Sequence, residues 1–252
     1  MIKALMHGAG GHMGKVVSEI ALSDPDIGIT CGVDPRDDIA ADCPVFKSLD
    51  DVTEDFDVII DFSNASAVDD LLEYTAKTGK GLVLCTTGLS EAQIAKVNEA
   101  AKKAPVLRSA NMSLGINTLM ALLKKATEVF VPAGYDVEVV EKHHNQKLDA
   151  PSGTAIALAD SVNEAAGNQF EYIYDRSQRR QKRDKKELGI SAVRAGTIVG
   201  EHDVIFAGTD EVITFTHTAY SKAVFAKGAV SAAKYIADKA PGLYDMADVI
   251  AG

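Results

Sequence analysis

The stretch that decides the fold opens the chain, where residues 2–20 read IKALMHGAGGHMGKVVSEI. The apolar run Ile2–Met6 predicts a short strand, and a helical pattern starts just after the glycines. Gly8, Gly11 and Gly14 give the spacing G-x-x-G-x-x-G, which departs from strict G-x-G-x-x-G. Glycines at a strand-to-helix turn let the backbone approach a pyrophosphate, whose charge the free amides of the helix start can bind. We therefore predict a dinucleotide-binding turn, with a glycine-rich turn that holds no ligand as the alternative.

The loop after the second predicted strand contains Asp34, Pro35 and Arg36. An acidic residue about twenty positions beyond the glycines can accept hydrogen bonds from the ribose hydroxyls of NADH. Arg36 could instead pair with the 2′-phosphate of NADPH, and a solvated turn is the third interpretation. Pro35 biases Asp34 towards an extended conformation, which suits an aspartate that reaches the ribose. We expect NADH to be used at least as well as NADPH.

Up to about Arg108, short apolar runs alternate with stretches of helical length. This rhythm is typical of an α/β protein in which crossover helices cover a parallel sheet, and it predicts a Rossmann-like, doubly wound sheet. The predicted strands and then helices are Ile2–Met6, Ile29–Val33, Val58–Asp61, Leu82–Cys85, Val106–Arg108, Met13–Leu22, Ala67–Lys77 and Glu91–Lys103.

The rhythm changes after Ser113, which predicts a second domain of mixed α/β type. In three segments late in this part, apolar and polar residues alternate, which predicts antiparallel strands with one solvent-exposed face. An edge or face of these strands could make a subunit contact. A final helix could return to the first domain. The predicted elements are a helix at Ile116–Val131, an extended run at Asp136–Val140, strands at Ile190–Val193, His202–Phe206 and Glu211–His217, and a helix at Ala229–Asp238.

Composition excludes several classes of protein. With 252 residues and 46% hydrophobic content, the chain can bury one large core or two modest ones. Cys31, Cys43 and Cys85 lack the spacing of a disulfide framework or a zinc site, which favours a reducing cytoplasm. No apolar run is long enough for a membrane span, so we expect no membrane partner. The net charge of −10 argues against a general nucleic-acid binder.

One segment, Arg176–Lys186, is strongly basic and supports a different hypothesis, a nucleic-acid-binding or redox-sensing regulator. Its cations are not interleaved with the aromatic residues on which bases stack, and the surrounding chain is acidic. A mobile, solvated loop is the preferred interpretation, so no nucleic-acid partner is expected.

The most informative stretch is residues 138–155, EVVEKHHNQKLDAPSGTA. A histidine can deliver a proton, and a lysine can pair with a carboxylate. The Ser-Gly-Thr that opens the helical run Ala155–Val162 could hold an anionic group. The alternative is that His143 and His144 end a surface strand and Lys147 is solvated. Successive strand residues face opposite ways, which argues against a metal held by the two histidines.

These residues carry a family resemblance. The pattern E-x-x-E-x-H-H-x-x-K-x-D-x-P-S-G-T-A resembles the signature of 4-hydroxy-tetrahydrodipicolinate reductases. Further matching segments cover essentially the whole chain in the same order, at Gly8–Gly14, Asp61–Ser63, Thr86–Gly88, Ser109–Ser113 and Val193–His202.

The resemblance implies reduction of 4-hydroxy-tetrahydrodipicolinate, a small anionic dicarboxylate, to tetrahydrodipicolinate with loss of water. The electrons would come from NADH or NADPH, and the reaction belongs to the diaminopimelate route to lysine. It also implies a homotetramer, with residues 1–113 and 221–252 as the dinucleotide-binding domain and residues 114–220 as the substrate-binding and oligomerisation domain.

Residue roles follow from the same resemblance. His143 and Lys147 would be catalytic, and His144, Lys147, Ser152, Gly153 and Thr154 would bind the substrate. No metal is implied. The cofactor would contact Gly8, Ala9, Gly10, Gly11, His12, Met13, Asp34, Cys85, Thr86, Thr87, Ser109, Ala110, Asn111 and Met112.

A relative of aspartate-semialdehyde or homoserine dehydrogenase would share the glycine turn, but the His-His-x-x-Lys segment separates the two possibilities. Cys85 is also a poor candidate for an acylating nucleophile, because an apolar strand end raises the pKa of a thiol. In the family this position is more often glycine, so the bulkier Cys85 makes the backbone approach of a cofactor there less certain.

Overall fold

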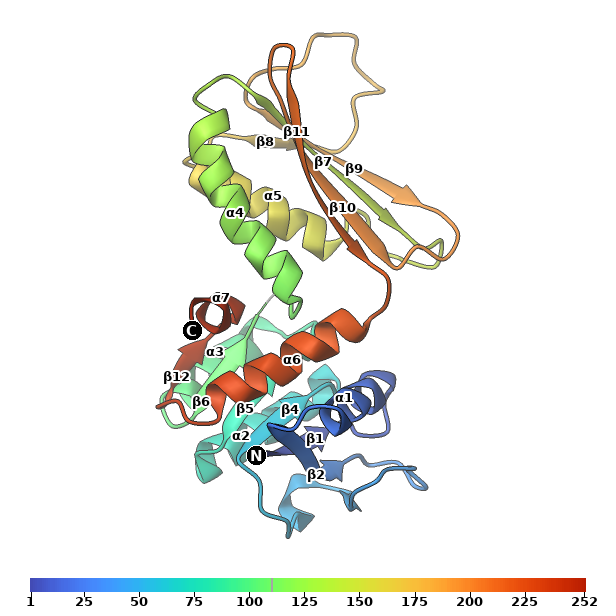
Figure 1. The fold of residues 1–252 in the computed structure, drawn as a ribbon, viewed down its shortest axis with the longest axis vertical. Helices are drawn as coiled ribbons and strands as arrows, with labels where there is room; N and C mark the ends of the chain where they lie inside the picture. The colour runs from blue at the N-terminus through green and yellow to red at the C-terminus, as the bar shows by residue number, and fades with distance from the viewer. Residues whose placement is uncertain (110) are drawn as a thin grey trace. The chain divides into compact units, whose positions relative to one another are not determined.

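The computed structural model describes residues 1–109 and 111–252, which divide into two compact units (Figure 1). The first unit comprises Met1–Leu114 together with Ala223–Gly252, and the second comprises Gly115–Lys222. Among the described residues, no helix combines the length and apolar character that a membrane span requires.

A seven-stranded sheet of parallel strands forms the centre of the first unit, in the order β12-β6-β5-β4-β1-β2-β3. The chain runs from β1 to β2 and β3 on one side of β1 and then crosses to β4 on its other side. Sheets of this kind bind ligands at the carboxyl ends of the strands where the order reverses. The predicted Rossmann-like sheet is confirmed. Its strands are β1 (Ile2–His7), β2 (Ile27–Val33), β3 (Val45–Phe46), β4 (Val58–Asp61), β5 (Gly81–Leu84), β6 (Pro105–Arg108) and β12 (Gly242–Tyr244).

Helices cover both faces of this sheet because successive strand residues point to opposite sides. Ala4 and Met6 of β1 pack in the hydrophobic cluster that α1 and α6 complete, whereas Leu5 packs in the cluster of α2 and α3. Each fully buried large apolar side chain contributes about 1.5–3 kcal/mol relative to exposure. The helices are α1 (His12–Leu22), α2 (Val68–Thr78), α3 (Glu91–Ala101), α6 (Ala223–Ile236) and α7 (Met246–Ala251), with short 3-10 helices at Leu49–Asp51 and Ala65–Ala67.

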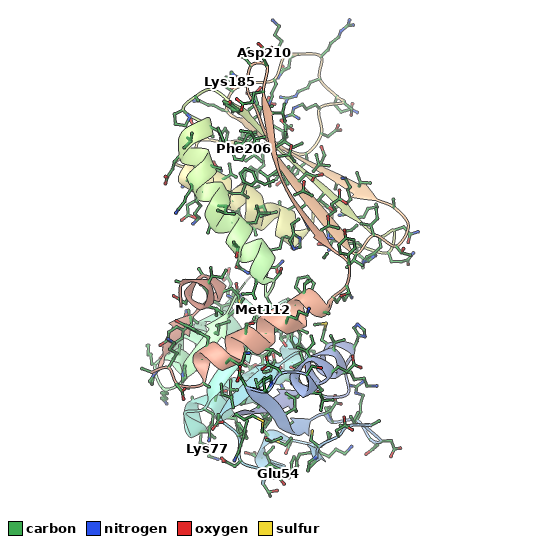
Figure 2. All side chains as sticks on the ribbon, viewed as in Figure 1. Glu54, Lys77, Met112, Lys185, Phe206 and Asp210 are labelled. Carbon is green, nitrogen blue, oxygen red and sulfur yellow. The ribbon has the colours of Figure 1, made fainter. Side chains whose placement is uncertain are left out.

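Helix α6 starts six residues before the predicted Ala229, at Ala223. Gly228 near its middle weakens the helical pattern in the sequence. The structure explains this glycine, because a Cβ there would lie 1.6 Å from the backbone oxygen of Met112. Figure 2 labels Met112 beside α6. The strands β3 and β12 were not predicted, since segments of two or three residues carry no periodicity.

The second unit contains a five-stranded sheet in the order β11-β10-β7-β9-β8. One set of alternating residues packs against the helices of this unit, and the buried Phe206, labelled in Figure 2, belongs to that core. The opposite set along β7 and β10 is half-buried. The elements are α4 (Leu114–Phe130), β7 (Asp136–His143), α5 (Gly153–Ala165), β8 (Glu171–Ile173), β9 (Glu187–Arg194), β10 (Gly200–Ala207) and β11 (Val212–Ala219).

The expectation of antiparallel strands is correct for β10 and β11 but wrong for β9. Strand β9 runs parallel to both of its neighbours, β7 and β8. The physical reason is the connection between β7 and β9, which passes through α5 and is long enough to bring the chain back in the same direction. This parallel pairing sets Arg194 opposite His143.

The basic segment Arg176–Lys186 is not simply a solvated loop. The guanidinium of Arg176 donates to both oxygens of Glu138 at 3.0 and 2.8 Å, and Arg183 Nε donates to Glu138 Oε1 at 3.0 Å. Arg179 forms an ion pair with Glu187 at 2.7 Å. The acids lie on β7 and β9, so Arg176, Arg179 and Arg183 are paired within the unit, and Glu138 is a partner distant in sequence.

Candidate functional site

The predicted glycine turn lies at the carboxyl end of β1, and helix α1 follows it directly. Gly8 has φ +85°, and a Cβ on it would lie 2.7 Å from the backbone oxygen of Phe62. A Cβ on Gly14 would lie 2.3 Å from Gly8 O. The N-cap residue of α1 is Gly11, and no side chain caps the helix start. The backbone is thus packed too closely for side chains and leaves the helix amides free, which fits the pyrophosphate of a dinucleotide.

Asp34 lies directly after β2, with only 3% of its surface exposed. Arg36 donates to its two carboxylate oxygens at 2.8 Å (Nε) and 2.7 Å (Nη2), and Gly10 N donates to Oδ2 at 2.9 Å. Hydrogen bonding from Arg36 outweighs burial and lowers the pKa of Asp34 to about 2. The carboxylate is therefore charged, as ribose recognition requires. Arg36 is bound to Asp34 itself, an arrangement that the sequence did not predict.

A buried polar network at the ends of β1, β4 and β5 was also missed. His7 Nδ1 lies 2.7 Å from Asp61 Oδ1, and the Thr86 hydroxyl donates to Asp61 Oδ2 at 2.6 Å. Asp61 is fully buried. Only Thr86 of these three was predicted to contact a cofactor. The signal that could have found the pair is that His7 and Asp61 end adjacent parallel strands, paired in register.

The remaining predicted cofactor segments follow β5 and β6. Cys85 and Thr87 flank Thr86, and burial raises the pKa of the Cys85 thiol, which agrees with its poor suitability as a nucleophile. After β6, Met112 is buried, and Asn111 Oδ1 accepts from the backbone of the residue two positions on at 2.8 Å. Ser109 is half-buried, and the predicted Ala110 lies outside the described residues.

In the second unit, β7 ends at His143, which is 8% exposed. Its Nδ1 lies 2.6 Å from Glu141 Oε2, and its ring meets His202 edge to face at 5.1 Å between centroids. A Cβ on Gly200 would lie 3.0 Å from His143 Nε2, so a glycine leaves space beside that nitrogen. His144 is half-buried and follows the strand. The interpretation of two surface histidines is wrong for His143.

Glu141 is fully buried and accepts four hydrogen bonds. Besides His143, Arg194 donates to Oε2 at 2.8 Å and to Oε1 at 2.6 Å, and Ser152 N donates to Oε1 at 3.0 Å. Burial alone would raise the pKa of Glu141, but the hydrogen bonds from Arg194, His143 and Ser152 outweigh it and lower the pKa. The sequence assigned no role to Glu141 or Arg194.

The loop that follows carries Lys147, whose Nζ lies 2.8 Å from Asp149 Oδ1. This pairing lowers the pKa of Asp149. Ser152 then caps α5, since its hydroxyl accepts from Ala155 N at 3.1 Å. The same hydroxyl lies 3.1 Å from His202 Nε2. The backbone NH and the hydroxyl of Ser152 are therefore both already bound within the protein.

His202, on β10 opposite Glu141, is 4% exposed. Burial, followed by the nearby His143, lowers the pKa of His202 to about 4, so its imidazole is neutral near pH 7. Although this residue lies in a segment that resembles the family, its contact with His143 comes only from the pairing of β7 with β10. Among the described residues, no group of three or more His, Cys, Asp or Glu side chains is placed to hold a metal ion.

Comparisons with known proteins cover the chain almost completely. A family model described as "Dihydrodipicolinate reductase, N-terminus" matches residues 2–112, and one described as "Dihydrodipicolinate reductase, C-terminus" matches residues 115–250. The chain belongs to the dihydrodipicolinate reductase family. It is therefore an oxidoreductase that depends on a nicotinamide cofactor, and the resemblance read from the sequence is confirmed.

Relatives in this family are similar over their whole length. The chain is 49% identical over 250 residues to the 4-hydroxy-tetrahydrodipicolinate reductase of Caldanaerobacter subterraneus, covering 99% of this chain and 98% of that protein. It is 47% identical over 251 residues to the enzyme of the same name from Clostridium botulinum, again covering 99% and 98%.

Solved structures share the fold of this chain. Dihydrodipicolinate reductase from Paenisporosarcina sp. TG-14, solved with bound dipicolinate, has a TM-score of 0.81 at 22% identity and covers 97% of each chain. A probable dehydrogenase from Thermotoga maritima has a TM-score of 0.63 at 12% identity, covering 98% of this chain and 92% of its own. At these identities the likeness supports the fold alone.

Proposed function

We propose that the chain catalyses the NAD(P)H-dependent reduction of 4-hydroxy-tetrahydrodipicolinate to tetrahydrodipicolinate with loss of water, in the diaminopimelate route to lysine. Family membership over nearly the whole chain supports this reaction. The observation that carries it is the buried His143, held by Glu141 at 2.6 Å at the start of the loop that bears Lys147. If His143 only ended a strand at the protein surface, a buried carboxylate to fix its ring would be a cost without a purpose.

Bound NADH or NADPH would supply a hydride, and the second unit would hold the substrate and supply the proton. His143 carries that proton on Nε2, because Nδ1 is engaged with Glu141. Lys147 exchanges Asp149 for a substrate carboxylate, and His144, Gly153 and Thr154 complete the binding of the dicarboxylate. Overall a hydride and a proton are added, and the substrate hydroxyl leaves as water.

Cofactor binding is proposed for the first unit. The turn Gly8–Met13 would hold the pyrophosphate, and Asp34 would bind the ribose. Cys85–Thr87 and Ser109–Met112 would contribute from the ends of β5 and β6. We infer that NADH is used at least as well as NADPH, because the ionised Asp34 favours ribose hydroxyls and repels a 2′-phosphate.

We further infer that the enzyme is a homotetramer. Val140 and Ile205, on the sheet face of the second unit opposite its core, are half-buried, and Val193 on β9 is 41% exposed. Apolar residues of this kind favour contact between subunits. All three cysteines are free thiols, which suits the reducing cytoplasm in which we place the enzyme.

The test is an assay of the purified protein with substrate generated by the preceding synthase. Oxidation of NADH and of NADPH is followed by absorbance, with and without substrate, for the wild type and for His143→Gln. We expect substrate-dependent oxidation of both cofactors by the wild type and a large loss for the variant. Absence of substrate-dependent oxidation by the wild type would contradict the proposed reaction. Light scattering measures the assembly state separately.

A further inference from the structure

Glu141 joins three elements of the second unit through one buried carboxylate. Oε2 lies 2.6 Å from His143 Nδ1 and accepts from Arg194 Nη1 at 2.8 Å. Oε1 accepts from Arg194 Nη2 at 2.6 Å and from Ser152 N at 3.0 Å. The side chains come from β7 and β9, and Ser152 is the N-cap of α5. A fully buried carboxylate is stable only when it is compensated in this way.

The two-point contact with Arg194 fixes the charge and direction of the Glu141 carboxylate. An ionised carboxylate has no proton to give, so His143 Nδ1 must be the donor across their 2.6 Å contact. The neutral ring of His143 is therefore held as the tautomer with its hydrogen on Nδ1. Nε2 is then the nitrogen that gains and loses the transferred proton. The space beside Nε2 is bounded by Gly200, which has no side chain to fill it.

Arg194 also holds the loop that carries Lys147. Its Nη2 donates to the backbone oxygen of Asp149 at 2.7 Å, in addition to Glu141. At the start of the loop, Asn145 N donates to Gly196 O at 3.1 Å. The loop is thus bonded near its start to the turn that follows β9 and near its end to Arg194, the last residue of β9, with Lys147 between these two contacts.

We propose that Glu141 and Arg194 are positioning residues of the reductase reaction, which orient His143 for proton transfer and fix the loop that presents Lys147. This inference rests on the proposed function. Neither residue is expected to touch the substrate or the cofactor. Both act through His143 and Lys147.

Charged and titratable groups surround His143 from each element packed against it. Glu141 from β7 is negative, and Arg194 from β9 is positive. His202 from β10 packs against the ring and is neutral near pH 7. Burial lowers the pKa of His217, which pairs with His202 from β11. The loop adds the cation Lys147, which is paired with the anion Asp149. Glu141 is therefore the charged carboxylate in direct contact with the His143 ring, and Glu141→Gln removes that charge.

The test compares Glu141→Gln with Glu138→Gln. Glu138 is a matched control, because it lies on the same strand and also accepts hydrogen bonds from two arginines, Arg176 and Arg183. In Glu141→Gln, Arg194 should retain the amide oxygen, which turns the amide NH2 towards His143 Nδ1 and reverses the tautomer. We expect kcat to fall at least about tenfold, while the Kd for NADH stays within about twofold.

Two readouts separate positioning from a general structural effect. The dependence of kcat/KM on pH should differ from that of the wild type in Glu141→Gln, because the group that faces His143 Nδ1 no longer carries a charge. The 15N shifts of the His143 ring should report the reversed tautomer. Glu138→Gln should show the wild-type profile and shifts. Wild-type kcat, pH profile and ring shifts in Glu141→Gln would overturn the inference.

A second variant covers the case in which Glu141→Gln does not fold. Arg194→Lys keeps the cation and leaves Glu141 in place, but it cannot donate through two parallel bonds and reach the backbone of Asp149 as well. We expect lower kcat and a higher KM for the substrate. Wild-type kinetics in this variant would overturn the inference. An inactive wild type would instead refute the proposed function, so the two failures are distinguishable.

Discussion

Replacing Arg36 by alanine should shift the nucleotide preference of the enzyme towards NADH. In the structure, Arg36 donates to both oxygens of Asp34 at 2.8 and 2.7 Å, and these are the oxygens that ribose hydroxyls would use. Arg36 therefore competes with NADH for Asp34, and it is also the cation available to a 2′-phosphate. Its removal should leave NADH binding unchanged or improved and should weaken NADPH binding.

The size of the effect follows from exposure. A hydrogen bond to a charged group contributes about 1.5–3 kcal/mol, but an exposed ion pair contributes less than about 1 kcal/mol. The Arg36 side chain is 58% exposed, so the lower figure applies. Because contacts of this kind are weak at exposed sites, we expect a fall of at most roughly fivefold in the NADPH/NADH ratio of kcat/KM. Moderate salt should reduce the difference, since it screens exposed charges.

The pH of the assay can be chosen so that Asp34 does not titrate. Its pKa is lowered to about 2, below the value of about 3.9 for an unfolded chain. The stabilisation of the folded state is therefore complete above the unfolded value and is lost as pH falls towards 2. Near neutral pH, Asp34 is charged in both wild type and Arg36→Ala, so a change in the ratio reports the arginine.

Steady-state assays with both cofactors at low and moderate salt measure the ratio. Asp34→Ala should shift it in the opposite direction, towards NADPH, and Arg180→Ala removes an exposed arginine of the second unit as the control. Equal losses for both cofactors in Arg36→Ala would refute the reasoning. So would a wild-type preference for NADPH above about a hundredfold, nearly 3 kcal/mol.

Four further substitutions test the second unit. His143→Gln should lower kcat by at least about a hundredfold without changing the Kd for NADH, and near wild-type single turnovers would exclude its acid–base role. Lys147→Ala should lower both kcat and substrate affinity, and an unchanged kcat/KM would contradict the proposed role of Lys147. Gly200→Ala should lower kcat, because its methyl group would lie 3.0 Å from His143 Nε2; an unchanged kcat would contradict the importance of that space. Asp149→Asn frees the Lys147 ammonium and should lower the KM for the substrate, which a raised KM would disprove.

Much of the fold could be predicted because its elements carry strong periodicity. The strand Val58–Asp61 and the start of α3 at Glu91 were predicted at their observed positions. Elements whose signal is weak were missed or shortened. Strand β12 has three residues, and α6 contains a glycine required by a neighbouring backbone. Strand direction was wrong for β9, because pairing between strands far apart in sequence leaves no local pattern.

The candidate site shows a similar division. His143 and Lys147 were found because they lie together in a distinctive segment. Arg194 was not assigned a role, since its contact with Glu141 depends on the parallel pairing of β7 and β9. The pairing of Arg36 with Asp34 was missed for another reason. Both residues were singled out in the sequence, but each was expected to bind a part of the cofactor, and a bond between the two side chains was not considered.

Glu141 itself was within reach of sequence reasoning. Residues two apart on a strand share a face, so Val137, Val139, Glu141 and His143 form one row, and all four are buried. An acid that continues an apolar row must be compensated, because an unpaired buried carboxylate costs several kcal/mol. The same physics applies to Asp61, buried at the end of β4 beside His7. In each unit a buried carboxylate holds a histidine at the carboxyl end of a strand inside the sheet, and hydrophobic packing alone would favour an apolar residue there. These carboxylates are better explained by the side chains that they orient than by the stability that they contribute.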